Sequence, residues 1–186
     1  MRSLVLLDRD GTINVEKHYL SSPDQVELLP AAAEGILQMR QLGLTVVVVT
    51  NQSAIARGYM DRRTLEQIHR RLCALLEEQG ASLDAIYVCP HHPDDGCVCR
   101  KPAPGLAQQA AAEWQAELSG SFVIGDNVCD IELGRRIGAT TLLVRTGYGA
   151  RVAADGTAQP DYVVDDLQHA ARVIAELIAN QQKRVE

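Results

Sequence analysis

The chain has 186 residues, of which 46% are hydrophobic, and a net charge of −6 from 18 basic and 24 acidic side chains. This length can bury one sizeable core, so we expect a single domain over residues 1–186. The sequence holds no basic tract that would bind nucleic acid, no apolar run of the roughly 18 residues that span a membrane, and no secretory signal. We therefore expect a soluble, cytoplasmic monomer without a nucleic-acid or membrane partner.

Short segments rich in Leu and β-branched residues recur along the chain, and they are typical of strands buried on both faces of a parallel sheet. The predicted strands are residues 4–7, 45–50, 85–89, 121–124, 140–144 and 162–164. Most stretches between them show helical periodicity, which predicts helices over residues 31–42, 62–79, 105–118, 130–137 and 167–180. This alternation predicts an α/β fold with a doubly wound, mainly parallel Rossmann-like sheet, helices on both faces, and ligands at the carboxyl ends of the strands.

Two inserts interrupt the alternation, at residues 14–28 after the first strand and at residues 90–104 after the third. Neither insert is longer than a loop, so we expect no large cap domain. The polar residues 181–186 are expected to form a flexible tail.

Acidic side chains follow two of the predicted strands directly. Asp8 and Asp10 come after the first strand and Asp126 after the fourth, so a parallel sheet should bring the three carboxyl groups together. Oxygen ligands of this kind suit Mg²⁺, although an Asp-Gly pair after one strand can equally be a simple turn. Thr50, at the end of the second strand, and Lys101 add a hydroxyl and a cation, the groups that a transferring phosphoryl group requires.

These segments resemble, in order and type, the four signature motifs of the haloacid dehalogenase superfamily. The motifs are an Asp-x-Asp-x-Thr segment at residues 8–12, Thr50, Lys101, and a Gly-Asp-x-x-x-Asp segment at residues 125–130. The resemblance implies a phosphatase in which Asp8 attacks phosphorus, while Asp10 protonates the leaving alkoxide and then deprotonates water. It also implies that Thr50 and Lys101 hold the phosphoryl oxygens.

The same resemblance implies how a catalytic Mg²⁺ is bound. Asp8 and Asp126 share the ion, and the backbone carbonyl of Asp10 is a further ligand. We expect Asp130 to orient a metal-bound water instead of binding the metal itself. An aspartyl phosphate divides one difficult displacement into two, so Asp10 can act as acid in the first step and as base in the second.

Three cysteines and two histidines lie within residues 89–99. An odd total of five cysteines, without a secretory signal, fits reduced thiols. Cys89, Cys97 and Cys99 could close a tetrahedral structural Zn²⁺ site with one histidine, and a loop with incidental thiols is the alternative. Spacing leaves both His91 and His92 open as the fourth ligand. A bacterial subgroup of the superfamily has a similar zinc loop, and this resemblance implies His91.

Zinc would brace the loop so that Arg100 and Lys101 are presented at a fixed position. The remaining cysteines, Cys73 and Cys129, are expected in the core or at a helix start. His69 is expected to be an ordinary helix-face residue.

The subgroup contains heptose bisphosphate phosphatases and histidinol-phosphate phosphatases. Residues 50–58 look like the second motif of the heptose enzymes, with Ala54 in place of a glycine. The resemblance implies hydrolysis of the 7-phosphate of D-glycero-D-manno-heptose 1,7-bisphosphate, in ADP-heptose and lipopolysaccharide core synthesis. Histidinol phosphate is the alternative substrate, and a zinc-stabilised binding module without activity is the non-enzyme alternative.

A set of polar side chains in the inserts and motifs is expected to bind the phosphorylated sugar. Its members are Glu16, Lys17, His18, Tyr19, Asn51, Gln52, Ser53, Arg57, Arg100 and Asn127. Arg100 can form two parallel hydrogen bonds with a second phosphate, whereas Lys17 and Arg57 could equally be solvated surface charges. Some heptose enzymes have a lysine where this chain has Asn127, which leaves the preference for the α or β anomer open.

Overall fold

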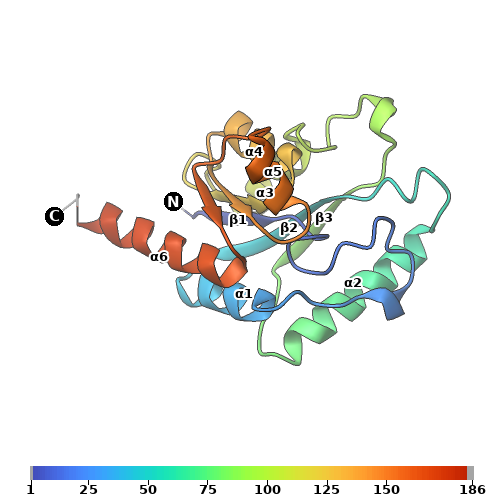
Figure 1. The fold of residues 1–186 in the computed structure, drawn as a ribbon, viewed down its shortest axis with the longest axis horizontal. Coiled ribbons are helices and arrows are strands. Elements are labelled where there is room, and N and C mark those ends of the chain that lie inside the picture. The colour runs from blue at the N-terminus through green and yellow to red at the C-terminus, as the bar shows by residue number, and fades with distance from the viewer. Residues whose placement is uncertain (1, 184–186) are drawn as a thin grey trace.

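One parallel sheet organises the chain. In residues 2–183, which the computed structural model describes, six strands lie in the order β3-β2-β1-β4-β5-β6 (Figure 1). The strands are β1 Leu4–Leu7, β2 Thr45–Asn51, β3 Ala85–Cys89, β4 Phe122–Gly125, β5 Thr140–Val144 and β6 Tyr162–Val164. The strand order reverses between β1 and β4, so this topology places ligands in the crevice at the carboxyl ends of those two strands. The predicted Rossmann-like sheet is confirmed.

Helices cover both faces of the sheet, as predicted. In the described chain they are α1 Ala32–Gln41, α2 Arg62–Glu77, α3 Gly105–Trp114, α4 Val128–Ile137, α5 Gly149–Asp155 and α6 Leu167–Gln182, with two 3-10 turns, η1 Pro23–Gln25 and η2 Pro93–Asp95. Helices α1, α2 and α6 pack on one face, and α3 and α4 on the other, with α5 beside α4 (Figure 1). The last turns of α6 project beyond the rest of the molecule.

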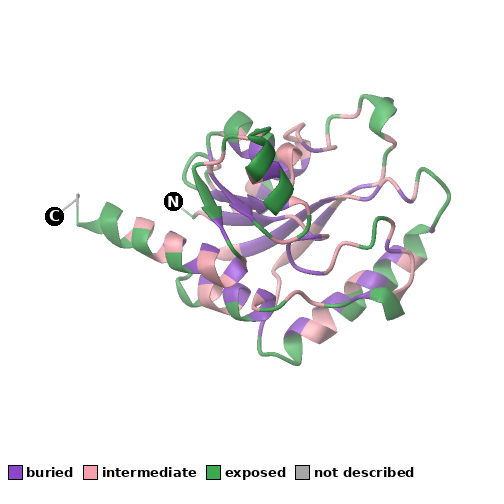
Figure 2. Ribbon diagram, in the orientation of Figure 1, coloured by how far each residue is buried: buried purple, intermediate pink, exposed green. Residues whose placement is uncertain are grey.

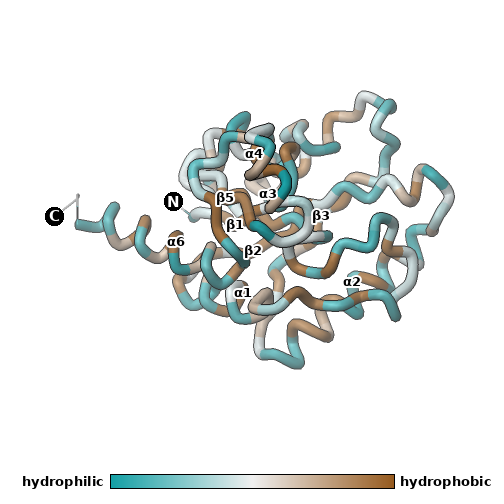
Figure 3. Tube along the Cα trace, viewed as in Figure 1, coloured by the Kyte–Doolittle hydropathy of each residue, from teal (hydrophilic) through white to brown (hydrophobic). Residues whose placement is uncertain are grey.

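The core consists of two apolar layers, one on each face of the sheet. Val5 and Leu7 of β1 belong to the layer shared with α1, α2 and α6, whereas Leu4 and Leu6 belong to the layer shared with α3 and α4. All four side chains are buried, and Figure 2 shows the central strands of the sheet coloured as buried. This enclosure explains the continuous apolar runs in the sequence, which Figure 3 shows clearly along β5.

Two helix boundaries differ from the prediction. Helix α3 ends at Trp114 instead of residue 118, because Gln115 adopts the left-handed conformation (φ 52°) and the next residue bridges to Arg2. Helix α4 begins at Val128 instead of residue 130, because Asn127 already serves as its N-cap.

The part of the chain after β5 also differs from the prediction. Helix α5 was not predicted, because its seven residues begin at a glycine and are too few to show a helical apolar period. Helix α6 continues to Gln182, so the first part of the expected flexible tail is helical, and residues 184–186 lie outside the described chain.

Both inserts lie at the carboxyl edge of the sheet (Figure 1). Residues 14–28 contact α2 through η1, and residues 90–104 lead from β3 to α3. Each insert is a loop that contains a single 3-10 turn, which agrees with the expectation of no large cap domain. Within residues 2–183, every helix is too short or too polar to cross a membrane.

Candidate active site and metal centre

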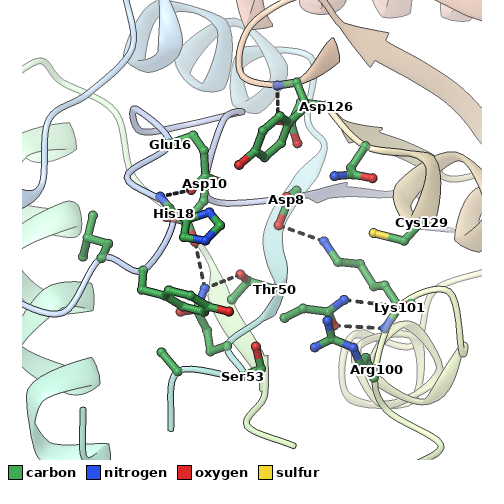
Figure 4. A pocket seen from close by; sticks show the side chains of 17 residues that line it. Asp8, Asp10, Glu16, His18, Thr50, Ser53, Arg100, Lys101, Asp126 and Cys129 are labelled. Carbon is green, nitrogen blue, oxygen red and sulfur yellow. Dashed lines mark hydrogen bonds and ion pairs between the residues drawn. The ribbon is translucent and has the colours of Figure 1, made fainter. Parts of the chain in front are cut away.

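A cavity of about 180 Å³ lies at the carboxyl ends of β1, β2 and β4 (Figure 4). Most of the predicted site residues line it, and they come from both inserts and all four motifs. They are Asp8, Asp10, Glu16, His18, Tyr19, Thr50, Asn51, Gln52, Ser53, Arg100, Lys101, Asp126 and Asn127.

Asp8 lies directly after β1 and forms an ion pair with Lys101. The Lys101 ammonium lies 2.8 Å from a carboxylate oxygen of Asp8 and 2.7 Å from one of Asp130. Burial opposes the charged form of Lys101, but the carboxylates of Asp130 and Asp8 outweigh burial and raise the pKa of the lysine. Burial also raises the pKa of Asp8 to about 7, despite the opposing charge of Lys101. Lys101 is therefore a fixed cation beside Asp8.

Asp126 adds a further carboxyl group to this pair. Side-chain oxygens of Asp8, Asp126 and Asp130 lie within 4.8 Å of one another. Burial, followed by the charges of Asp8 and Asp130, raises the pKa of Asp126 to about 8. A single lysine cannot balance three carboxylates, so the cluster carries buried negative charge that a divalent cation would neutralise.

The segment between β5 and α5 holds Asp126 in place. The backbone N–H of Tyr148 donates to Oδ2 of Asp126 at 2.7 Å, and the Thr146 hydroxyl donates to the carbonyl of Gly11 at 2.6 Å. Gly147 has a φ of 53°, and a Cβ on it would fall 2.0 Å from Oδ2 of Asp126. No prediction covers this segment, although a glycine-rich turn directly after a buried strand is a signal that points to it.

Replacing Gly147 by Ala should weaken cation binding, because the new Cβ displaces the Asp126 carboxylate. The strained backbone should also lower the free energy of unfolding by about 1–3 kcal/mol. Calorimetric titration with Mg²⁺ and urea unfolding measure the two effects. Gly156→Ala is the matched control, because Gly156 has a similar φ of 62° but open space around it. Equal Mg²⁺ affinity in the two variants would contradict the expected role of Gly147.

Three buried side chains hold the carboxylate of Asp10. Arg9 donates to Oδ2 at 2.7 Å and to Oδ1 through Nε at 3.1 Å. Asn14 donates to Oδ1 and Gln52 to Oδ2, both at 2.9 Å. Burial raises the pKa of Asp10, but the Arg9 charge and these hydrogen bonds outweigh it, so the pKa is lowered. Asp10 is therefore held as a carboxylate at the cavity wall.

Arg9 had no predicted role, and the expectation for His69 was incomplete. Arg9 is 1% exposed, and its NH1 lies 3.1 Å from Nε2 of His69 on α2. Burial, followed by the Arg9 charge, lowers the pKa of His69 to about 4, so a neutral ring can accept a hydrogen bond from the arginine. His69 is thus a partner of Arg9 and not an ordinary helix-face residue, and no sequence pattern connects two positions 60 residues apart.

The end of β2 links two of the predicted motifs. Gln52 donates to the Thr50 hydroxyl at 2.8 Å. The Asn51 side chain accepts from the Lys101 N–H at 3.0 Å and donates to the Lys101 carbonyl at 3.2 Å. Asn51 therefore fixes the backbone of the lysine that faces Asp8.

The first insert forms one wall of the cavity with polar and aromatic side chains. His18 has a φ of 64°, and its N–H contacts the Glu16 carboxylate (Figure 4). The His18 ring packs edge-on against Tyr19, with centroids 4.7 Å apart, and Tyr19 packs in the same way on Tyr59 at 4.8 Å. These contacts fix the orientations of Glu16, His18 and Tyr19 in the cavity wall.

Two predicted substrate residues do not line the cavity. Lys17 forms an exposed ion pair with Glu27 at 3.1 Å. The Arg57 guanidinium lies 5.8 Å from the centroid of the Tyr19 ring. Lys17 is therefore paired at the surface, whereas Arg57 lies beside Tyr19, which lines the cavity.

The two cysteines outside residues 89–99 lie on helices. Cys73 is half-buried on α2, and Cys129 is the second residue of α4. Cys129 also lines the cavity beside Lys101 (Figure 4), a position that the prediction of a helix-start residue did not include.

Four side chains, one at the end of β3 and three in the loop that follows it, converge as a metal-binding cluster would. The Cys89 sulfur lies 3.6 Å from both Nδ1 of His91 and the Cys97 sulfur, and the Cys99 sulfur lies 3.1 Å from that Nδ1 and 3.5 Å from the Cys97 sulfur. Zn–S bonds of about 2.3 Å imply tetrahedral edges of about 3.5–3.8 Å, close to most of these distances. His92 instead caps η2 and accepts the backbone N–H two residues on, so the geometry selects His91.

Comparison with known proteins places the chain in a family. Residues 98–170 match the HAD-hydrolase-like family model. The D-glycero-β-D-manno-heptose-1,7-bisphosphate 7-phosphatase of Pseudomonas aeruginosa is 42% identical over 94% of this chain and 99% of its own length. The chain belongs to the D-glycero-D-manno-heptose 1,7-bisphosphate 7-phosphatase family.

Two further members of the heptose bisphosphate phosphatase family support this membership. The enzyme of Pseudomonas putida is 42% identical over 91% of this chain and 97% of its own length. The crystal structure of D,D-heptose 1,7-bisphosphate phosphatase from B. bronchiseptica, complexed with magnesium and phosphate, matches with a TM-score of 0.88 at 38% identity, over 94% of this chain and 98% of that one. The predicted resemblance to the haloacid dehalogenase superfamily, and to its heptose bisphosphate phosphatases, is confirmed.

Proposed function

We propose that the protein is a Mg²⁺-dependent phosphatase that removes the 7-phosphate of D-glycero-D-manno-heptose 1,7-bisphosphate through an aspartyl phosphate on Asp8. In this role it serves ADP-heptose and lipopolysaccharide core synthesis in the cytoplasm. The observation that carries the proposal is the position of Asp8 in the cavity, 2.8 Å from Lys101 and in one cluster with Asp126. The names of the relatives support the substrate, because the match covers 94% of this chain and 99% of the Pseudomonas aeruginosa enzyme.

The residues present fit a Mg²⁺ ion held by the side chains of Asp8 and Asp126 and the backbone carbonyl of Asp10. Burial, together with the neighbouring carboxylates, raises the pKa values of Asp8 and Asp126, and a bound divalent cation would favour their ionised forms. When bound, the ion neutralises phosphate charge and stabilises the charge of the transition state. Asp130 forms an ion pair with Lys101 at 2.7 Å. This pairing suits a carboxylate that orients a ligand of the ion better than one that binds the ion directly.

In the first step, a carboxylate oxygen of Asp8 attacks phosphorus as the bond from phosphorus to the sugar oxygen breaks. Asp10 gives its proton to the departing alkoxide. The dianionic substrate beside Asp10 favours the protonated form that this step needs, against the effect of Arg9. Thr50 and Lys101 hold the phosphoryl oxygens.

In the second step, water attacks the phosphorus of the aspartyl phosphate and releases Asp8 as a carboxylate. Asp10, now ionised, takes the proton of that water. The lowered pKa of Asp10 suits this role as a base. One carboxylate thus serves both proton transfers.

We assign Arg100 to the second phosphate of the substrate. Arg100 lines the cavity, and its NH1 is buried without a hydrogen-bond partner in the part of the chain that the structure describes. A buried N–H without a partner costs free energy unless a ligand accepts its hydrogen bond. A phosphate is a suitable acceptor for a guanidinium. Glu16, His18, Tyr19, Gln52, Ser53 and Asn127 line the same small cavity and are proposed to contact the sugar.

We also propose that the cluster of Cys89, His91, Cys97 and Cys99 holds a structural Zn²⁺. Four protein ligands would close the coordination shell, so the ion would stabilise the loop and take no part in the reaction. The next two residues are Arg100 and Lys101. The loop would therefore set the position of both cations.

A substrate panel tests the proposed function. With Mg²⁺ present, kcat/KM for heptose 1,7-bisphosphate should exceed that for histidinol phosphate at least about tenfold, because the polar cavity groups discriminate between the two leaving groups. Both anomers and common sugar phosphates complete the panel. Omission of Mg²⁺ should abolish phosphate release from every substrate.

Each outcome of the panel has a distinct meaning. Higher efficiency on histidinol phosphate would overturn the substrate assignment and keep the mechanism. Absence of Mg²⁺-dependent phosphate release from all substrates would favour a binding module that kept the fold and lost the chemistry. Protein carrying Asp8→Asn is the blank that corrects for contaminating phosphatases.

A further inference from the structure

Arg9 carries a buried positive charge that the mechanism above does not use. Its guanidinium contacts three side chains from different parts of the chain. NH2 lies 2.7 Å from Oδ2 of Asp10 and 3.0 Å from Oε1 of Gln52, and NH1 lies 3.1 Å from Nε2 of His69. These contacts come from the loop after β1, the end of β2 and helix α2.

Gln52 joins Arg9 to Asp10 and so closes a ring of hydrogen bonds among the three side chains. Its side-chain oxygen accepts from Arg9, and its side-chain nitrogen donates to Asp10 at 2.9 Å and to Thr50 at 2.8 Å. A guanidinium is planar and rigid, so contacts on several of its edges fix its orientation. The carboxylate bound to two of its nitrogens is then fixed as well. Asp10 keeps 20% of its side chain exposed, at the cavity wall.

We infer that Arg9 is a positioning residue for the reaction: it holds the Asp10 carboxylate in the orientation needed for proton transfer, and His69 holds Arg9 from the side away from Asp10. The inference rests on the proposed function, because proton transfer by Asp10 is part of that proposal. A misplacement of about 1 Å at a reacting group can lower a rate by about 100-fold. Arg9 therefore acts on the reaction through Asp10 and without touching the substrate.

The test compares two leaving groups in the variant Arg9→Lys, which keeps the positive charge and loses the planar fork. Departure of the heptose alkoxide requires a proton from Asp10, whereas p-nitrophenolate departs without one. Because kcat/KM covers the steps up to release of the alcohol, we expect a fall of about 100-fold for heptose 1,7-bisphosphate. We expect a fall of less than about threefold for p-nitrophenyl phosphate.

A second measurement keeps the inference testable without the aryl substrate. If Arg9 acts through Asp10, Arg9→Lys should lower kcat/KM for the heptose substrate little further in an Asp10→Asn background. Arg40→Lys is the matched control, because Arg40 pairs with Asp84 outside the cavity. This control should affect both substrates equally and weakly.

His69 provides a variant that leaves Arg9 and Asp10 in place. His69→Leu removes the hydrogen-bond acceptor of the Arg9 guanidinium. It should lower kcat/KM selectively for the heptose substrate, as Arg9→Lys does, but by about a tenth of that factor. His69→Gln retains an acceptor and should restore heptose turnover. This pair decides the question if Arg9→Lys does not fold.

The outcomes separate this inference from the proposed function. If the wild-type protein hydrolyses neither substrate with Mg²⁺ present, the proposed function fails. Suppose instead that the wild-type protein is active but Arg9→Lys and His69→Leu lower the turnover of both substrates equally, or that their effects add fully to the effect of Asp10→Asn. The positioning role of Arg9 is then refuted and the phosphatase assignment stands. A selective loss of alkyl phosphate turnover, absent from Arg40→Lys, supports the inference.

Discussion

Replacing Asp8 by Asn should abolish phosphate ester hydrolysis, with a loss in kcat on the order of 10⁴- to 10⁶-fold, as expected when a covalent nucleophile is removed. The amide has almost the shape of the carboxylate but cannot form the acyl phosphate. Lys101 keeps its second partner, Asp130, at 2.7 Å, so the surrounding contacts should survive. Phosphate release assays with Mg²⁺ and heptose 1,7-bisphosphate measure the loss.

The same substitution should stabilise the folded protein when no Mg²⁺ is added. Burial raises the pKa of Asp8 from 3.8 to about 7, so the ionised carboxylate disfavours the folded state increasingly as pH rises through this range. Asp8→Asn removes this cost, and at pH 8 we expect a gain on the order of 1–3 kcal/mol in the free energy of unfolding. The gain should shrink as the pH falls from 7 and vanish only below about pH 3, where Asp8 is protonated in both the folded and the unfolded state.

Urea unfolding at several pH values tests this stability prediction. The medium should lack added Mg²⁺ but contain no chelator, because a chelator would also remove zinc. Asp165→Asn, which changes an exposed carboxylate outside the cavity lining, is the control for a general change of charge. An Asp8→Asn protein that retains most of its activity, or that is less stable than wild type at pH 8, would count against the assigned site.

Replacing Cys99 by Ser should lower zinc content, stability and rate together. Loss of a structural zinc ligand should lower the melting temperature by about 10 °C or more in a chain of this size. The rate should fall by about 100-fold, because Arg100 and Lys101 follow the loop directly and depend on it for their position. Metal analysis, thermal unfolding and steady-state kinetics measure the three effects.

Cys73→Ser is the matched control for the zinc prediction. Cys73 is a half-buried thiol on α2, outside the cluster, so its substitution should leave zinc content unchanged. Wild-type protein that purifies fully active without zinc would show that the loop holds no structural metal. A Cys99→Ser protein with normal zinc would show that the ligand set is different.

Much of the fold and of the acidic cluster could be predicted because both depend on local patterns. Continuous apolar runs predict buried parallel strands, and parallel strands bring their carboxyl ends to one edge. Asp8 and Asp126 each follow such a run, so topology alone places them together. The Cys and His spacing after β3 likewise predicted a cluster that the structure forms.

The rest depends on contacts that no local pattern records. The pairing of Arg9 with His69 requires α2 to pack near the loop after β1, and the choice of His91 requires His92 to cap a turn. Long side chains on a loop are also hard to place, because small changes in backbone direction decide whether they reach a cavity. Lys17 could therefore have faced the substrate, but it pairs with Glu27 at the surface.

The most direct test of the account is chemical trapping of the phosphorylated enzyme during turnover. Acid quenching with substrate and Mg²⁺ present, followed by peptide mass spectrometry, should find one phosphoryl group on the peptide that contains Asp8. Borohydride reduction should convert that residue to homoserine, and the Asp8→Asn protein should show neither product. Rapid phosphate release without an acyl phosphate on Asp8, or with the phosphoryl group on another residue, would contradict the central claim.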